Sequence, residues 1–281
     1  MNRLFCSTQG DYSFIRCIFF GNPSSQITGT GGAIYLKNNG ASLTIDSCQF
    51  HSIAVSGDGC ALYINYPQKV NITDSLFDRC HPPGYEVGGV GAVFLLYCPQ
   101  PLIQNCLFSS CTCSADGGAV YLYHGYCSWN NGIAVQDSRF ICCKCTGETT
   151  GDGSDGGGLM TYANDELLGI RNCLFSHCYS YKGAGIYLCV PNKRSLTPIQ
   201  FCCFIKNSGT YGNDVFVDNA TIFSWSIIFS HSCTAGSAHT LGVIGNPPQH
   251  VANNWLPPTT INSKFTADKG ASSSESPTLY E

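Results

Sequence analysis

The sequence predicts an all-β fold: a single-stranded, right-handed parallel β-helix (a solenoid) of about eight coils, or rungs, with an irregular C-terminal tail. Three observations carry this prediction: a repeat of about 30 residues, frequent glycine and a low share of charged residues. Charged residues make up 11 % of the chain, against roughly 25 % in ordinary globular domains. Helices normally carry Lys, Glu and Arg on their wet faces, so this composition favours strands.

A recurring phenylalanine defines the repeat. The residue two positions before it is Cys or Ser and the residue five positions before it is apolar in the first seven copies. Asn or Cys stands three positions after it in most copies. Stacked parallel strands about 4.8 Å apart place equivalent residues in ladders, so each position keeps its chemical type. The repeated residues are Phe19, Phe50, Phe77, Phe108, Phe140, Phe175, Phe204 and Phe229.

A second motif, glycine and small residues followed by strand formers, comes after each phenylalanine. Clear copies occupy residues 31–36, 59–64, 117–122 and 183–188. No unit with two short strands can bury its own apolar face, so neighbouring units must stack. Leu is not periodic, which argues against a leucine-rich solenoid. We therefore predict a β-helix over residues 1–245 and a Pro/Ser-rich, extended or disordered tail over 246–281.

These two motifs resemble the repeats of the polymorphic outer-membrane-protein family, which are pectin-lyase-like right-handed parallel β-helices. Phe19 to Asn22 and Phe204 to Asn207 match the Phe-x-x-Asn motif, whereas four other copies have Cys in place of Asn. The resemblance covers about residues 14–236. It implies a cell-surface passenger used in adhesion.

The chain contains 19 cysteines, for which the sequence leaves three fates open. Small buried thiols are favoured over disulfides between neighbouring coils, because parallel Cβ atoms lie at the edge of the disulfide range. Zinc is the third alternative, but the C-x-x-C of Cys142 to Cys145 has no second ligand pair at suitable spacing. The insertion 142–158 lacks the carboxylates of a calcium loop and indicates a surface loop. We predict no metal and no cofactor.

Catalysis on a β-helix would need carboxylates, with or without Arg or Lys, converging on one face across adjacent coils. Asp74 and Asp137 occupy equivalent positions two coils apart, which places them about 9.6 Å from each other along the axis. Asp and Asn are also ordinary turn residues, and no basic column accompanies these two. We predict no catalytic residue and interpret them as turn residues.

An aromatic stripe is the candidate binding surface. It lies two residues after the small residue of the second motif, and Thr161 interrupts it. Strand alternation places it opposite the aliphatic core positions, where it could bind a glycan or a host or cell-surface protein. The alternative is a structural, inward-facing or covered column. The stripe consists of Tyr35, Tyr63, Phe94, Tyr121, Tyr187 and Phe216.

These observations favour a non-catalytic β-helix protein, at the cell surface or extracellular, that acts as an adhesin or structural spacer. The alternatives are a carbohydrate-active enzyme (a polysaccharide lyase or hydrolase) and an intracellular scaffold with reduced cysteines. A net charge of −4 with scattered basic residues argues against a nucleic-acid partner. The sequence shows no apolar run near the ~18 residues of a transmembrane segment and no apolar signal-peptide stretch at its start.

Overall fold

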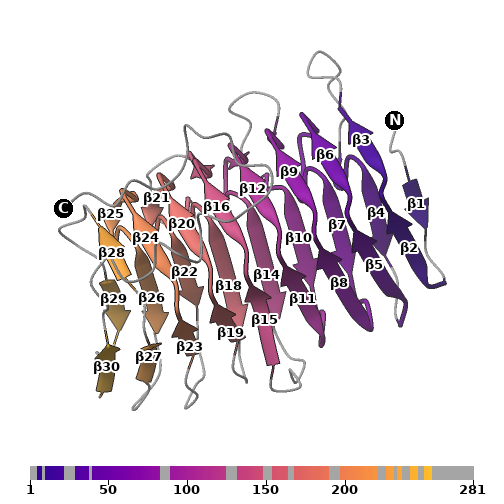
Figure 1. Cartoon of the computed structure of the whole chain (residues 1–281). Helices are drawn as coiled ribbons and strands as arrows, with labels where there is room; N and C mark the ends of the chain where they lie inside the picture. The colour runs from indigo at the N-terminus through magenta and orange to yellow at the C-terminus, as the bar shows by residue number, and fades with distance from the viewer. Residues whose placement is uncertain are drawn as a thin grey trace.

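The computed structural model describes residues 5–7, 10–21, 29–37, 40–82, 89–124, 132–147, 154–163, 168–189, 197–219, 226–230, 233–235, 241–245 and 250–254. Within these ranges the chain contains strands and no helix, and therefore no helix that could cross a membrane. The strands stack into an elongated β-helix, with β1 (Phe5–Ser7) at one end and β30 (His250–Asn254) at the other (Figure 1). The predicted fold class is confirmed.

Four parallel sheets run along the β-helix, and we name them A to D. Sheet A contains β1, β4 (Ile34–Lys37), β7 (Leu62–Asn65), β10 (Val93–Leu96), β14 (Val120–His124), β18 (Leu159–Ala163), β22 (Ile186–Cys189), β26 (Val215–Asn219) and β29 (Leu241–Gly245). Sheet B contains β2 (Tyr12–Ile15), β5 (Ser42–Asp46), β8 (Lys69–Thr73), β11 (Pro101–Gln104), β15 (Gly132–Gln136), β19 (Leu168–Arg171), β23 (Thr197–Gln200), β27 (Ser226–Ser230) and β30.

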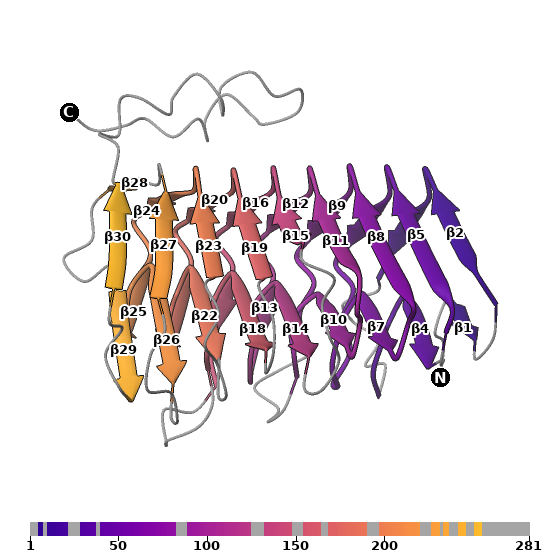
Figure 2. The same cartoon turned by 90° about the horizontal axis from the view of Figure 1, so that it is seen from below.

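Sheet C contains β3 (Ile18–Phe20), β6 (Gln49–His51), β9 (Leu76–Asp78), β12 (Leu107–Ser109), β16 (Arg139–Ile141), β20 (Leu174–Ser176), β24 (Cys203–Ile205) and β28 (Cys233–Ala235). Sheet D contains β13 (Thr112–Cys113), β17 (Lys144–Cys145), β21 (Tyr179–Lys182) and β25 (Ser208–Tyr211). Figure 2 shows successive strands of sheets A and B side by side along the axis. Sheets A and B have nine strands each and sheet C has eight, against about eight coils expected.

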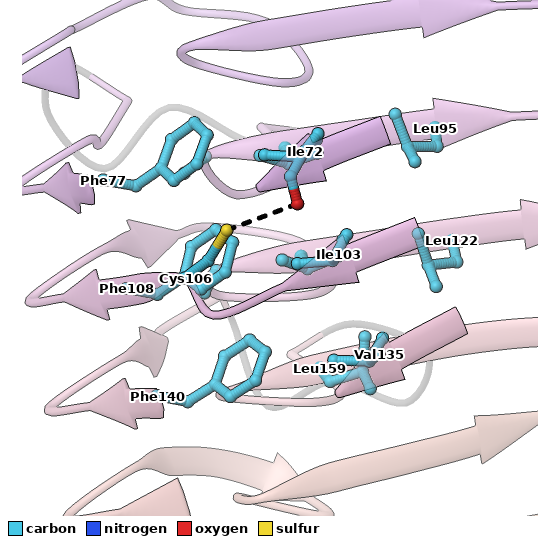
Figure 3. Close-up of a cluster of buried hydrophobic side chains, with 14 of the residues drawn as sticks. Ile72, Phe77, Leu95, Ile103, Cys106, Phe108, Leu122, Val135, Phe140 and Leu159 are labelled. Atoms are coloured by element: carbon cyan, nitrogen blue, oxygen red, sulfur yellow. Dashed lines mark hydrogen bonds between the residues drawn. The ribbon is translucent and has the colours of Figure 1, made fainter. Parts of the chain in front are cut away.

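The repeated phenylalanines form a continuous ladder inside the β-helix. The rings of Phe50, Phe77, Phe108, Phe140 and Phe175 are fully buried and lie parallel to one another, with neighbouring centroids 4.6–4.9 Å apart. Apolar side chains of sheets A and B pack beside them (Figure 3). The ladder therefore couples each coil to the next through ring faces as well as backbone hydrogen bonds.

The prediction that Phe229 is the last member of the phenylalanine ladder is wrong. Phe204 in sheet C pairs with Thr234, whereas Phe229 lies in sheet B opposite Ile199. The interval from Phe204 to Phe229 is shorter than every other interval in the repeat. In this coil the aromatic residue has moved to the sheet B column, and Thr234 takes the anchor position.

Strand pairing also continues beyond residue 245. The strand β30 lies within the predicted tail 246–281 and pairs in parallel with β27 over five residues. The rest of the tail, residues 246–249 and 255–281, lies outside the described residues, as does Asn22 of the first Phe-x-x-Asn motif.

The turn between sheets B and C explains the acidic and amide residues before each phenylalanine. Asp74, Asn105, Asp137 and Asn172 have φ between 51° and 53°, a left-handed conformation that Asp and Asn tolerate better than most residues. The Asn172 amide donates to Asp137 Oδ1 over 2.6 Å, and Asn105 donates to Asp74 in the same way. Asp74 and Asp137 are therefore members of a turn ladder, as the sequence indicated.

The Asn-to-Cys exchange in the Phe-x-x-Asn motif has a direct explanation. The Asn207 amide donates to the Phe175 carbonyl of the preceding coil over 3.1 Å. The Cys143 thiol donates to the equivalent Phe108 carbonyl over 3.5 Å. Both side chains are buried and serve the same acceptor, so a small donor is what the position requires. The cysteines of this column are buried thiols: Cys80, Cys111, Cys143 and Cys178.

Replacing Phe108 by Ala is expected to lower the free energy of unfolding by about 3–5 kcal/mol, because the ring is fully buried in the middle of the ladder. Urea denaturation of the two proteins measures this loss. The matched control is Phe20→Ala, whose ring is 69 % exposed and should change stability by no more than about 0.5 kcal/mol. Equal losses from the two substitutions would contradict the ladder's role.

Candidate functional site on the outer face of sheet A

The aromatic stripe lies on the face of sheet A opposite the core, as strand alternation predicted, but most of it is not exposed. It forms a second hydrophobic cluster, separate from the interior. Phe94, Tyr121, Tyr187 and Phe216 are buried, with 1–8 % of their surface exposed, and the two N-terminal members, Tyr35 and Tyr63, are half-buried. The C-terminal part of the stripe is therefore a covered column, as in the structural alternative, and not an exposed patch.

The expected interruption at Thr161 is also corrected. Met160 pairs with both Tyr121 and Tyr187, and Thr161 instead aligns with Leu122 on the core side. The cause is the third glycine of this coil, Gly158, which takes the place of the motif alanine. Met160 therefore continues the stripe as a long apolar side chain.

Stacking decides which part of each ring can meet a partner. The rings of Tyr35 and Tyr63 lie 12° from parallel at 5.1 Å, and those of Tyr187 and Phe216 lie 11° from parallel at 5.5 Å. The ring faces of each pair therefore contact each other along the axis of the β-helix. A glycan could therefore reach ring edges and hydroxyl groups of these pairs more readily than ring faces.

Polar residues converge beside the stripe at the turn between sheets D and A. Asp116, Asp155 and Lys182 occupy the same position in three consecutive coils and form backbone bridges with one another. The Lys182 Nζ atom lies 3.7 Å from Asp155 Oδ2, and both side chains are largely buried. The ammonium also lies 6.0 Å from the Tyr187 ring centroid and 5.8 Å from that of Phe216, within the range of cation–π attraction.

Tyr187 extends this arrangement to the next coil. Its hydroxyl donates to Asp218 Oδ2 over 2.9 Å, and burial raises the pKa of the hydroxyl, which keeps it a donor at neutral pH. We call the five residues Asp116, Asp155, Lys182, Tyr187 and Asp218 the acid–lysine cluster. It joins the polar turn to the aromatic stripe.

Two acids of the cluster, Asp116 and Asp155, have pKa values raised towards neutral pH. Burial, together with the charge of Asp155, raises the pKa of Asp116 to about 7. Burial raises the pKa of Asp155 to about 6, although Lys182 and the Tyr187 hydroxyl partly oppose this shift. Asp155 Oδ1 is buried without a hydrogen-bond partner. Acids next to an ammonium group could exchange protons with a ligand. Of the three acids in the cluster, Asp116 and Asp218 are partly accessible, whereas Asp155 is buried.

The acid–lysine cluster was not predicted, although the sequence contains a signal for it. A charged residue directly precedes a motif glycine in four copies: Asp58, Asp116, Asp155 and Lys182. Asp155 was assigned to the surface insertion 142–158, of which residues 148–153 lie outside the described residues. Among the residues that the structure describes, no group of three or more His, Cys, Asp or Glu could hold a metal ion.

Comparison with known families bears on the fold. The chain matches the family described as "Right handed beta helix region" over residues 2–236. It belongs to this right-handed β-helix family. No curated protein and no solved structure matches the chain. For this β-helix protein, function must be argued from its own side chains.

The acid–lysine cluster predicts that this β-helix protein loses stability as pH rises. Folding raises the pKa of Asp116 and Asp155 above the unfolded value of about 3.9, so their protonated forms are favoured in the fold. This contribution is complete below about pH 4 and is lost as pH rises through about 6 to 7. The thermal unfolding midpoint should therefore fall between pH 5 and pH 8.

Asp116→Asn should flatten this fall. It should not abolish it, because Asp155 and Asp214 remain, and burial raises their pKa to about 6 and about 7. Asp137→Asn is the matched control, since Asn occupies the same turn column in neighbouring coils, and it should keep the wild-type slope. A slope that is identical in all three proteins would contradict the assignment.

Proposed function

We propose that this protein is a non-catalytic β-helix, of the polymorphic outer-membrane-protein type, that acts at the cell surface or outside the cell as an adhesin or structural spacer. The observation that carries the proposal is that the polar groups of the acid–lysine cluster contact one another and are largely buried. Asp155, Lys182 and Tyr187 are buried and engage one another or their neighbours. A reactive site needs such groups open to substrate. Here the three side chains are covered, and their polar contacts are with one another or with Asp218, although Asp155 Oδ1 has no hydrogen-bond partner.

The repeated coil supports a spacer role. Each coil contacts only its two neighbours, through the same columns of side chains. The coils therefore continue in one direction and form an extended rod. Exposed aromatic side chains suited to contact with a partner remain at Tyr66, Tyr179 and Tyr211, which are 46–48 % exposed. Their hydroxyl groups fit a glycan or a host or cell-surface protein as the partner.

Antibody labelling of intact and permeabilised cells tests the location. Labelling of intact cells, equal to that after permeabilisation, is the expected result. An antibody against a strictly cytosolic protein controls for leakage. Signal only after permeabilisation would overturn the proposal and favour an intracellular scaffold.

The acid–lysine cluster favours one second candidate, a carbohydrate-active enzyme. Its carboxylates, ammonium group and phenol converge on one face across adjacent coils, which is the arrangement that acid–base cleavage of polysaccharides uses. In this candidate Asp116, the more accessible acid with a pKa near neutrality, would exchange the proton. The buried Lys182 would act on Asp155 through their ion pair.

Incubation of the purified protein with neutral and acidic polysaccharides, followed by assay of new sugar ends, separates the two candidates. The non-catalytic proposal predicts no release above a heat-denatured control. Release by the wild type and by Asp137→Asn, but not by Asp116→Asn or Lys182→Met, would replace it by the enzyme.

A further inference from the structure

Cys113 and Cys145 form a thiol pair in sheet D. They are register partners in the adjacent strands β13 and β17, and both are buried. Their thiols hydrogen-bond to each other, and burial raises the pKa of both. Neither belongs to the acid–lysine cluster, although Cys113 lies three residues before Asp116 and Cys145 ten residues before Asp155.

This pair differs from the column of Cys80, Cys111, Cys143 and Cys178 in that each of its two thiols has only one cysteine as its register partner. Cys111 interacts with thiols on both sides, Cys80 and Cys143, so no partner is unique there. The pair is different because β13 is the first strand of sheet D. In the next coil, Lys144 pairs with Tyr179, so the residue aligned with Cys145 is Ser180 and not a cysteine. An oxidant can therefore produce only one product from neighbouring thiols at this position.

The geometry of stacked coils permits a bridge. Register partners in parallel strands lie about 4.8 Å apart at Cα, within the range of about 4.4–6.8 Å found for disulfides. Their Cβ atoms lie at the edge of the disulfide range, so a bridge must draw the two Cβ atoms slightly together. The same β-helix already contains a disulfide-bonded cysteine, Cys203. The residue opposite it on the next coil is Cys233.

Access to the buried pair comes from the sheet that holds it. Sheet D has four strands, and β13 and β17 are only two residues long. Short strands at a sheet edge open locally more often than long central ones. Local opening of β13 would expose both thiols together.

We propose that Cys113 and Cys145 form a coil-bridging disulfide when the protein meets a low-molecular-weight disulfide such as glutathione disulfide. One thiolate attacks the small disulfide, giving a mixed disulfide and releasing one small thiol. The second cysteine then attacks the protein sulfur of the mixed disulfide and releases the other small thiol. The two cysteines are oxidised, the small disulfide is reduced, and the two protons end on the two thiol products.

The bridge joins two coils directly beside Asp116 and Asp155. It closes the chain between the two cysteines in the unfolded state, which favours the fold. Oxidation should therefore raise the thermal unfolding midpoint by several degrees. The effect does not depend on the proposed surface function, because it is measured on the purified chain.

The experiment starts from the full chain, purified fully reduced and then incubated with glutathione disulfide. Remaining thiols are alkylated, the protein is digested, and linked peptides are identified by mass spectrometry. A linked pair containing Cys113 and Cys145 is expected. The Cys203 bridge in the same digest shows that oxidation has proceeded.

Three variants make the result specific. Cys113→Ser and Cys145→Ser should lose both the linked peptide and the oxidative rise in unfolding midpoint; serine is tolerated, since Ser180 is buried in the same column. Cys106→Ser is the matched control, because Ser75 and Ser138 occupy the equivalent positions of the neighbouring coils, and it should keep both. Alkylation of Cys113 and Cys145 while the Cys203 bridge forms, or linkage of either to another cysteine, would overturn the proposal.

Discussion

The structure depends on one constraint: no coil of this chain can bury its own apolar face, so every coil uses the next one as its cover. Parallel hydrogen bonding sets the spacing, and side chains of one kind then lie on one another. The phenylalanine ladder is the strongest expression of this constraint, with ring centroids of Phe77 and Phe108 4.8 Å apart. The distance between stacked rings nearly equals the distance between hydrogen-bonded strands. The rings can therefore stack without distorting the sheet.

The same constraint governs the polar residues. Ser138 Oγ accepts a hydrogen bond from the backbone N–H of Cys106 in the preceding coil over 3.1 Å. The thiols of the Cys80–Cys178 column instead donate to backbone carbonyls of the preceding coil. At the turn beside sheet A, however, stacking places two acids and a lysine in one column. Burial raises the pKa of both acids, and the charge of Asp155 adds to the rise at Asp116, whereas Lys182 opposes it. The repeat therefore creates the acid–lysine cluster without any local motif.

The fold could be predicted because its signal is repeated many times. The turn residues, the core columns and the outward direction of the stripe all follow from position within the repeat. Departures from the repeat were not predictable in the same way. Phe229 lies in another sheet, and Gly158 stands in place of the motif alanine, so that Met160, and not Thr161, continues the stripe. The burial of Tyr187 and its contact with Asp218 depend on neighbouring coils, which a single repeat does not describe.

Deletion of one whole coil tests the central claim most directly. Removing residues 106–137 joins Asn105 to Ser138, which stands where Cys106 stood, and keeps every column in register. The protein should retain its β-sheet circular dichroism and unfold cooperatively. Removing only residues 106–121 joins positions from different sheets and should abolish folding. If both shortened proteins are equally unfolded, or equally folded, the coils are not interchangeable units and the account fails.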